Sequence, residues 1–131
     1  MTRINVVPVE ELSDAWLIAE YRELPRVLKG NFSIKDAPNR YKLGTGHVKW
    51  ARKHALFVLD RYHSLVEEMK YRGFKVNYTD DLKRYLTKDI SNCYTICNED
   101  IKVNRERLVE RYKSNINFHR WTKRKKPEYL M

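Results

Sequence analysis

The feature that most constrains the fold is a long run of apolar residues spaced alternately three and four positions apart. The run covers about six helical turns, and Leu59 and Val66 widen its apolar stripe. This spacing puts the apolar side chains on one face of an α-helix, and that face must be buried against other elements. Arg72, Gly73 and Phe74 follow the run and predict a glycine-capped helix end. The stripe consists of Val48, Ala51, Ala55, Val58, Tyr62, Leu65 and Met69.

A second helical pattern precedes this run. It extends from about Glu10 or Ser13 to Leu28, and Gly30 is expected to end it because glycine often follows the last helical residue. Pro25 lies inside the pattern and, because it lacks a backbone N–H, should kink the helix. The core face of this helix is predicted to contain Leu17, Tyr21, Leu24 and Leu28, and the opposite face is charged.

A third helix is expected to begin near Asn98, whose side chain is well suited to capping a helix N-terminus. Residues 31–46 contain turn-forming residues and predict a loop, and residues 75–97 predict a short helical turn within 80–86 plus a connection. We therefore expect an all-α fold, a single compact domain over residues 1–131 with three main helices and irregular loops. The core face of the third helix is predicted to contain Ile101, Leu108, Tyr112 and Ile116.

The charge of the chain is strongly positive and unevenly distributed. The formal net charge is +10, and ten Lys or Arg residues stand against four Asp or Glu in residues 31–75 and against three in residues 102–131. Two basic segments of this kind indicate a surface that neutralises phosphates. The last 14 residues, 118–131, interleave aromatic and basic side chains, which can stack on bases or pack back on the protein. Charge alone fits a ribosomal or RNA-associated protein equally well.

Several classes of protein do not fit the sequence. No apolar run approaches the ~18 residues needed to span a bilayer, and the first residues lack the apolar core of a signal peptide. Cys93 and Cys97 are four residues apart without a matching second pair of Cys or His residues, so we expect two reduced thiols and no metal site. These features predict a cytoplasmic protein that needs no metal or cofactor.

Three short segments resemble one enzyme family. They are TRIN at residues 2–5, AEYRELPRV at residues 19–27 and LGTGHV at residues 43–48. Together they resemble the pyrimidine-dimer DNA glycosylase/AP lyase family of T-even phages, also called the endonuclease V family of UV-repair enzymes. Residues 105–111 are similar to the third helix of that family. The resemblance implies helices with an N-terminal segment that threads between them, and a damaged double-stranded DNA substrate. If the chain is of phage origin, we expect it in the cytoplasm of the host cell.

The resemblance also implies roles for individual residues. Thr2, exposed once Met1 is removed, would supply the α-amine that attacks C1′ of the damaged nucleotide. Glu23 would stabilise the resulting iminium intermediate and assist proton transfers. Trp16 stands where the phage enzymes have a histidine beside the catalytic centre, and an indole there can stack on a base. The residues implied to hold phosphates are Arg3, Arg22, Arg26, Arg107 and Arg111.

Elementary chemistry supports the first two of these roles. An α-amine has an ordinary pKa of about 7.7–8, against about 10.4 for lysine, so a useful fraction is nucleophilic at neutral pH. Attack by an amine on a sugar carbon develops positive charge, which an adjacent carboxylate such as Glu23 stabilises. The sequence therefore predicts a monomeric, soluble DNA-repair enzyme with no membrane partner. The alternatives are the same lyase chemistry on a different damaged base, or a non-catalytic DNA-binding relative.

Overall fold

A computed structural model of the chain describes residues 3–30, 33–77 and 81–131. Within these ranges the regular structure is entirely helical, which confirms the all-α expectation. The four α-helices are α1 (Asp14–Lys29), α2 (His47–Lys53), α3 (Ala55–Tyr71) and α4 (Asn98–Ser114). Four short 3₁₀ helices complete the set: η1 (Val9–Glu11), η2 (Leu82–Tyr85), η3 (Ile116–Phe118) and η4 (Glu128–Leu130).

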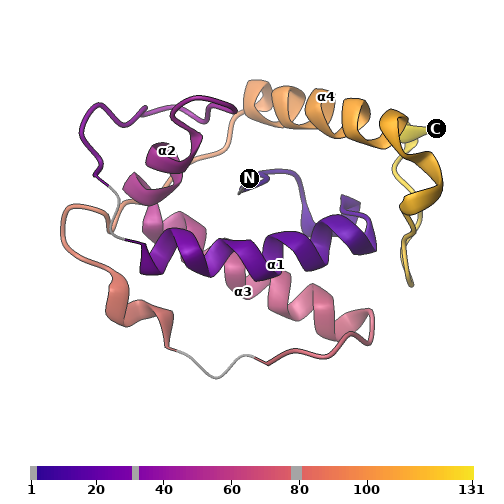
Figure 1. Cartoon of the computed structure of the whole chain (residues 1–131), viewed down its shortest axis with the longest axis horizontal. Helices are drawn as coiled ribbons and strands as arrows, with labels where there is room; N and C mark the ends of the chain where they lie inside the picture. The colour runs from indigo at the N-terminus through magenta and orange to yellow at the C-terminus, as the bar shows by residue number, and fades with distance from the viewer. Residues whose placement is uncertain (1–2, 31–32, 78–80) are drawn as a thin grey trace.

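Helix α1 has the boundaries that its sequence predicts. Ser13 caps its N-terminus, where the hydroxyl oxygen accepts a hydrogen bond from the Trp16 backbone at 3.2 Å. Gly30 caps its C-terminus and donates its N–H to the Arg26 carbonyl at 2.9 Å. Leu17, Leu24 and Leu28 of the predicted core face are fully buried, and α1 packs mainly on α3, which lies behind it in Figure 1.

The long second helix of the sequence pattern is two helices, so the prediction of one unbroken helix was wrong. The break lies at His54, whose backbone has φ −108° and ψ 45°. Residues 90–92 account for it, because the Ala55 N–H donates to the Ile90 carbonyl at 3.0 Å instead of to a carbonyl four residues earlier. The Asn92 side chain also donates to the Lys53 carbonyl at 2.8 Å. A distant segment thus takes over the backbone groups where the helix would have continued.

Of three further predictions about the helices, the glycine-capped end of α3 is confirmed and two predictions about α4 are wrong. Gly73 ends α3 with φ +85°, a conformation open to glycine, and the Phe74 N–H donates to the Met69 carbonyl at 2.9 Å. The N-cap of α4 is Cys97 rather than Asn98, and the Asp100 carboxylate accepts the Cys97 N–H at 3.1 Å. Ile116, predicted to be buried, is 52% exposed because α4 ends at Ser114 and Ile116 lies in η3, outside the helical register.

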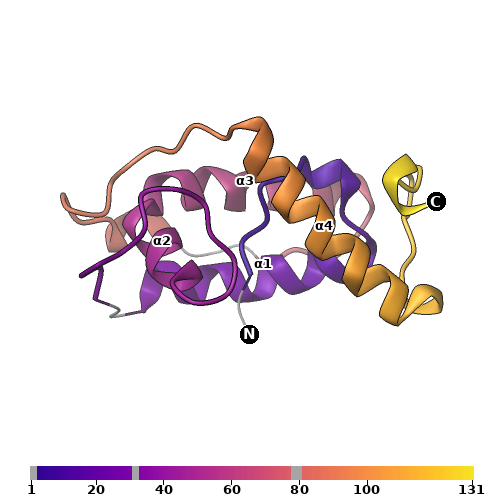
Figure 2. The ribbon, with the colours of Figure 1, turned by 90° about the horizontal axis from the view of Figure 1, so that it is seen from above.

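The two ends of the chain pack against the helices without regular strands or long helices of their own. Residues 4–7 are buried and pass between α4 and the layer formed by α1 and α3, which confirms the threading implied by the family resemblance (Figures 1 and 2). The tail, residues 118–131, folds back on the start of α1, where the Asp14 N–H donates to the Arg120 carbonyl at 2.7 Å.

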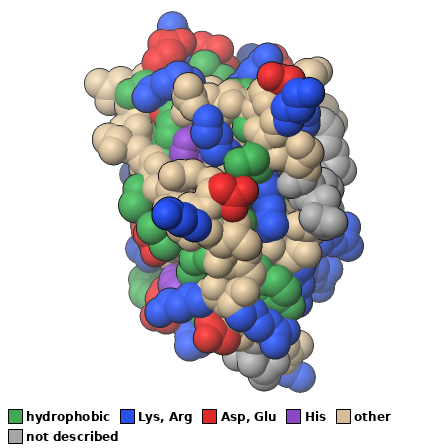
Figure 3. All heavy atoms as spheres, turned by 90° about the vertical axis from the view of Figure 1, so that its left-hand side faces the viewer, with side chains coloured by type: hydrophobic (Ala, Val, Ile, Leu, Met, Phe, Trp, Pro, Cys, Tyr) green, Lys and Arg blue, Asp and Glu red, His purple; other side chains and the backbone are tan. Residues whose placement is uncertain are grey.

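Charged side chains cover much of the surface. On the end of the molecule that carries α2, Lys and Arg side chains are spread around the face with acidic side chains between them, so this end carries no single basic stripe (Figure 3). In the parts of the chain that the structure describes, no helix is long and apolar enough to cross a membrane.

Candidate active site

A pocket of about 140 Å³ opens between α1, α4 and the N-terminal segment. It gathers four residues that the family resemblance had implied, although they lie far apart in the sequence: Arg3, Trp16, Glu23 and Arg111. Thr2, the implied nucleophile, lies outside the described residues. The remaining lining residues are Asn5, Ala19, Glu20 and Leu108.

The pocket is bordered by positive charge. Arg3 is half-buried, and burial followed by the positive charges of Arg111 and Arg107 lowers the pKa of its guanidinium. Arg107 does not line the pocket; it is half-buried on α4 and lies 3.6 Å from the Glu110 carboxylate. Three cations that repel one another in this way favour an anion placed among them, which is the property a phosphate-binding site needs.

Glu23 and its neighbours on α1 lie at the rim. The Arg26 guanidinium donates to Glu23 Oε2 at 3.0 Å, and the Arg26 side chain is 73% exposed against 32% for Glu23. Arg22 is exposed on the same helix but does not line the pocket. Of the five predicted arginines, two line the pocket, Arg3 and Arg111, and the other three, Arg22, Arg26 and Arg107, do not.

A second carboxylate at the pocket was not predicted. Glu20 is 2% exposed and its Oε2 accepts the Arg61 Nε–H at 2.8 Å, while Oε1 accepts the Asn5 side-chain N–H at 2.7 Å. Both of its oxygens are thus occupied by donors. A signal was present in the sequence, because Glu20 stands three residues after Leu17 and four before Leu24, on the apolar face of the helix.

Asn104, on α4, fixes the N-terminal segment from the other side. Its Oδ1 accepts the backbone N–H groups of Val6 at 2.7 Å and Val7 at 3.1 Å, and its Nδ2 donates to Asn5 Oδ1 at 2.8 Å. The Arg61 guanidinium donates to the Val7 carbonyl. Buried backbone groups outside regular structure need such partners, so these side chains replace the hydrogen bonds that a helix or strand would supply.

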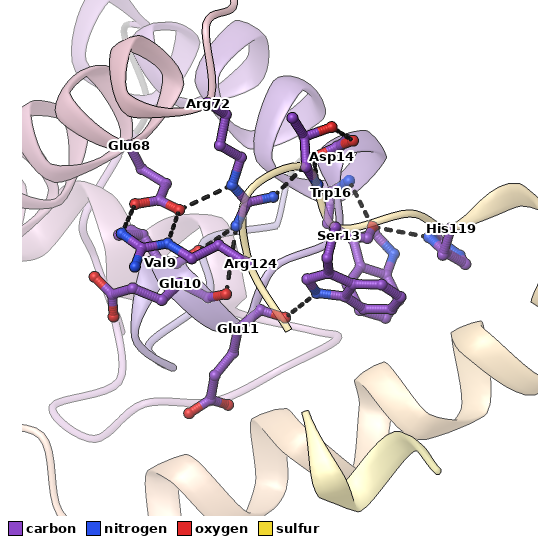
Figure 4. Close-up of polar contacts among 12 residues, drawn as sticks. Val9, Glu10, Glu11, Ser13, Asp14, Trp16, Glu68, Arg72, His119 and Arg124 are labelled. Carbon is purple, nitrogen blue, oxygen red and sulfur yellow. Dashed lines mark hydrogen bonds and ion pairs between the residues drawn. The ribbon is translucent and has the colours of Figure 1, made fainter. Parts of the chain in front are cut away.

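Trp16 forms a wall of the pocket and is backed by the C-terminal tail. Its ring lies 4.4 Å from the His119 ring and 6.3 Å, edge on, from the Trp121 ring, measured between centroids. His119 Nδ1 is 2.8 Å from the Ser13 hydroxyl, and the Trp121 indole N–H donates to the Glu11 carbonyl at 2.9 Å (Figure 4). Of the two alternatives for the tail, packing on the body is therefore the one observed.

An ion-pair network ties the tail to α1 and α3, with Arg72 and Glu68 buried and Asp14 and Arg124 partly exposed (Figure 4). The Arg72 side chain is fully buried and contacts Glu68 at 2.8 Å and Asp14 at 3.0 Å. Arg124 from the tail reaches both oxygens of Glu68, and Thr122 donates its hydroxyl to Asp14 Oδ2 at 2.6 Å. Charges buried to this degree are retained when each has hydrogen-bonded partners. Arg72 and Glu68 both lie at the end of α3, whereas their bonds to Asp14 and Arg124 join α3 to α1 and to the tail.

The described residues were also compared with the ligand groups that metal ions need. Within residues 3–30, 33–77 and 81–131, no three His, Cys, Asp or Glu side chains are grouped closely enough to hold a metal ion. Cys93 and Cys97 are both free thiols, and Cys97 Sγ lies 2.7 Å from the Arg40 guanidinium.

The comparison with known families covers the larger part of the chain. The model of one family, described as pyrimidine dimer DNA glycosylase, matches residues 1–86. The match takes in the N-terminal segment, α1, α2 and α3, and with them Arg3, Trp16 and Glu23 of the pocket; α4 and the tail lie beyond it. The chain therefore belongs to the pyrimidine dimer DNA glycosylase family, whose members are DNA-repair glycosylases.

Proposed function

We propose that the chain excises a base of a cyclobutane pyrimidine dimer in duplex DNA and then cleaves the strand as an AP lyase. The Thr2 amine attacks C1′ and loses a proton while the N-glycosidic bond breaks, and the base takes the bonding electrons. The C1′–O4′ bond of the sugar ring then opens and O4′ takes up a proton, which leaves an iminium between Thr2 and C1′. Loss of a proton from C2′ and departure of the 3′ phosphate oxygen then complete a β-elimination. Hydrolysis of the iminium regenerates the amine.

The observation that carries this proposal is the pocket itself. It brings Arg3, Glu23 and Arg111 to one place, beside the N-terminal segment of the chain. Two residues of extended chain span about 7 Å, so an amine two residues before Ile4 cannot lie farther than that from the Ile4 nitrogen. Because Arg3 lines the pocket, covalent geometry keeps the proposed nucleophile within reach of it.

The two carboxylates of the pocket suit different tasks. Both oxygens of Glu20 are occupied by donors from Arg61 and Asn5, so this carboxylate stabilises the fold. Glu23 is partly exposed at the rim, with Arg26 on one of its oxygens. We therefore assign the electrostatic stabilisation of the iminium and the proton transfers to Glu23. Arg3 and Arg111 would hold phosphates on either side of the lesion, with Arg22 and Arg26 contacting DNA beyond the rim.

Trapping with sodium borohydride tests the reaction class and the substrate together. Duplexes carrying a thymine dimer, an abasic site or no damage are incubated with the protein, and a covalent adduct is expected on the first two only. An adduct on the abasic site alone would show lyase chemistry aimed at another base. Binding of the dimer duplex without any adduct would indicate a non-catalytic DNA-binding protein.

Mass spectrometry of active protein should show that Met1 is absent, and acetylating the amine of Thr2 should abolish the adduct.

The role of Glu23 is tested by Glu23→Gln. We expect glycosylase turnover to fall by about 10² or more while affinity for the dimer duplex is retained, because a positioned acid or base contributes on that scale. Glu67→Gln, at a carboxylate that is 78% exposed on α3, removes the same charge away from the pocket and serves as the control. Equal losses of turnover and affinity in Glu23→Gln would contradict the catalytic assignment.

A further inference from the structure

The N-terminal segment has one anchor closer to the chain terminus than all the others described above. The Ile4 N–H donates to Nε2 of His47 at 2.8 Å, 43 residues away in the sequence. On the other side of the same residue, the Tyr41 hydroxyl donates to the Ile4 carbonyl at 2.9 Å. Only Arg3 separates this anchored residue from Thr2. The two hydrogen bonds therefore fix the peptide groups on both sides of Ile4, which follows Arg3 in the chain.

His47 is itself rigidly held. It is 3% exposed, and its Nδ1 lies 2.8 Å from the Lys42 carbonyl. Since a carbonyl only accepts, Nδ1 carries the proton and Nε2 is left as the acceptor that the Ile4 N–H requires. The imidazole is stacked on Trp50 with 6.0 Å between ring centroids, and Tyr41 meets it edge on at 5.7 Å. Two hydrogen bonds and two rings thus fix both the tautomer and the plane of the side chain.

We propose that His47 is a positioning residue for the glycosylase/lyase reaction, which directs the N-terminal amine at the pocket through its hydrogen bond to the Ile4 peptide. This inference rests on the proposed function, because it takes the Thr2 amine as the nucleophile. Neither Tyr41 nor Asn104 can replace His47 in this role. Tyr41 contacts the carbonyl of Ile4, and Asn104 contacts the segment at Val6 and Val7, farther from the terminus.

The charged groups around His47 favour the neutral form that this role needs. Burial lowers the pKa of the imidazole, and the positive charges of Arg3 from the N-terminal segment and Arg107 from α4 lower it further, against the opposing effect of the Lys42 carbonyl. Tyr41, on the loop, and Trp50, on α2, face the ring with aromatic surfaces. Protonated at Nε2, the ring would meet the Ile4 N–H with a second donor and lose the anchor.

Two amide substitutions separate positioning from structural support. In His47→Gln the amide oxygen extends about as far as Nε2 and can still accept the Ile4 N–H, but the contact with Lys42 is lost. In His47→Asn the shorter amide lies near the position of Nδ1, so it can reach the Lys42 carbonyl but not Ile4. Both variants bury one amide in place of an imidazole, and similar losses of unfolding free energy are expected for the two. His54→Asn is the matched control, because His54 is a buried histidine on the other side of Trp50 whose Nδ1 bonds the Trp50 carbonyl at 2.7 Å.

The readout is the single-turnover rate of borohydride trapping on abasic duplex, with duplex affinity measured in parallel. His47→Asn should slow trapping by about tenfold or more at unchanged affinity, since a displacement near 1 Å can cost up to about 10² in rate. His47→Gln and His54→Asn should stay within about threefold of the parent protein. Equal slowing in His47→Asn and His47→Gln, or equal slowing in His54→Asn, would assign His47 to stability alone and overturn the inference.

Amide hydrogen exchange gives a second readout that does not depend on turnover. In isoleucine-labelled protein, the Ile4 amide should exchange faster in His47→Asn than in His47→Gln, relative to the global unfolding rate of each variant. Unchanged protection of Ile4 in His47→Asn would overturn the proposal. The proposed function and the role of His47 can also be rejected independently of each other. Absence of trapping by the parent protein rejects the proposed function, whereas normal trapping by a folded His47→Asn variant rejects only the role of His47.

Discussion

The two ends of the chain are both irregular, and both are fixed to α1, yet different forces hold them. The N-terminal segment, residues 4–7, is buried and receives its hydrogen bonds from side chains on all four α-helices and the loop before α2. The tail, residues 118–131, is largely half-buried or exposed and is held by aromatic contacts and by ion pairs such as Arg124 with Glu68. Buried hydrogen bonds are costly to break, whereas partly exposed ion pairs contribute less and weaken in salt.

The difference matches the division of labour that we propose for the pocket. The N-terminal segment carries the proposed nucleophile and must be held to within a fraction of an ångström. The tail contacts Trp16, a wall residue of the pocket, and lies beyond the residues that the family model matches. In this proposal, the nucleophile depends on the end of the chain that is held by buried hydrogen bonds. The Trp16 wall, which we propose faces the lesion, depends on the end whose anchors are more exposed.

Removing a side chain that anchors the N-terminal segment should cause the largest loss in the free energy of unfolding. Asn104→Leu leaves the N–H groups of Val6 and Val7 and the Oδ1 of Asn5 buried without partners. We expect a loss of about 3–5 kcal/mol in the free energy of unfolding, since each unsatisfied buried group costs about 1–3 kcal/mol. Urea denaturation followed by circular dichroism measures it. Asn98→Leu, at an exposed position on the same helix, should change the stability by less than about 0.5 kcal/mol.

Acid should weaken the N-terminal end through His47. Burial, followed by the charges of Arg3 and Arg107, keeps the pKa of His47 below its ordinary value of 6.5, which the unfolded chain retains. As pH falls below 6.5 the unfolded chain therefore binds a proton that the folded protein does not, and stability declines by up to about 1.4 kcal/mol per pH unit for this group. His47→Gln should reduce the slope between pH 6.5 and 5.5. His63→Gln, at an exposed site on α3, is the control, and an equal reduction there would contradict the assignment.

How much of the fold could be predicted from the sequence depends on how far apart the interacting residues are along the chain. The spacing of apolar residues predicted α1, α3 and α4 because it reflects contacts within a few turns of each helix. The break at His54 could not be predicted, because it depends on a distant segment: the Ile90 carbonyl accepts the Ala55 N–H, and the Asn92 side chain donates to the Lys53 carbonyl. Ile116 was misplaced because the periodic pattern does not reveal that α4 has already ended.

The same limit applies to the site. Family resemblance identified Arg3, Trp16, Glu23 and Arg111, and the structure brings these four side chains into one pocket. Asn104 was missed, because its contact with Val6 spans 98 residues. Its position between Ile101 and Leu108 in the apolar register was the available signal, since a polar residue there must be buried with partners. The role of His47 required knowledge of a contact that no local spacing indicates.

Removing an anchor of the tail should lower the free energy of unfolding less than Asn104→Leu does. Thr122→Val keeps the shape of the side chain but removes the hydroxyl that donates to Asp14 at 2.6 Å. Asp14 retains Arg72 and the Thr122 backbone N–H as partners, so we expect a loss of about 1–1.5 kcal/mol in unfolding free energy. Thr122→Ser restores the hydroxyl and should recover most of it. A loss as large as that of Asn104→Leu would show that the two ends are equally important to stability.

The smallest effect is expected from replacing exposed lysines of the tail, which should change only the salt dependence of DNA binding. Arg124 and Lys126 are engaged with Glu68 and the Tyr112 hydroxyl, whereas Lys123 and Lys125 are exposed at the same end of the molecule. Each phosphate that a lysine neutralises adds about 0.9 to the slope of log affinity against log salt. Replacing Lys123 and Lys125 by Gln should therefore lower this slope by up to about 1.8. Damaged and undamaged duplexes should be affected equally, with stability unchanged.

The control for the tail lysines is an equal change of charge at another exposed site. Lys83 and Lys88 are exposed in and after η2, which Figure 1 places at the opposite end of the molecule from the C-terminus. Replacing both by Gln removes the same net charge, so any long-range effect of charge should match, but direct phosphate contacts should not be lost. If both double variants lower the slope equally, the tail has no contact of its own with DNA. If instead the tail variant alone reduces the preference for dimer-containing duplex, lesion recognition extends from the Trp16 wall into the tail, and the separation of the two ends is incomplete.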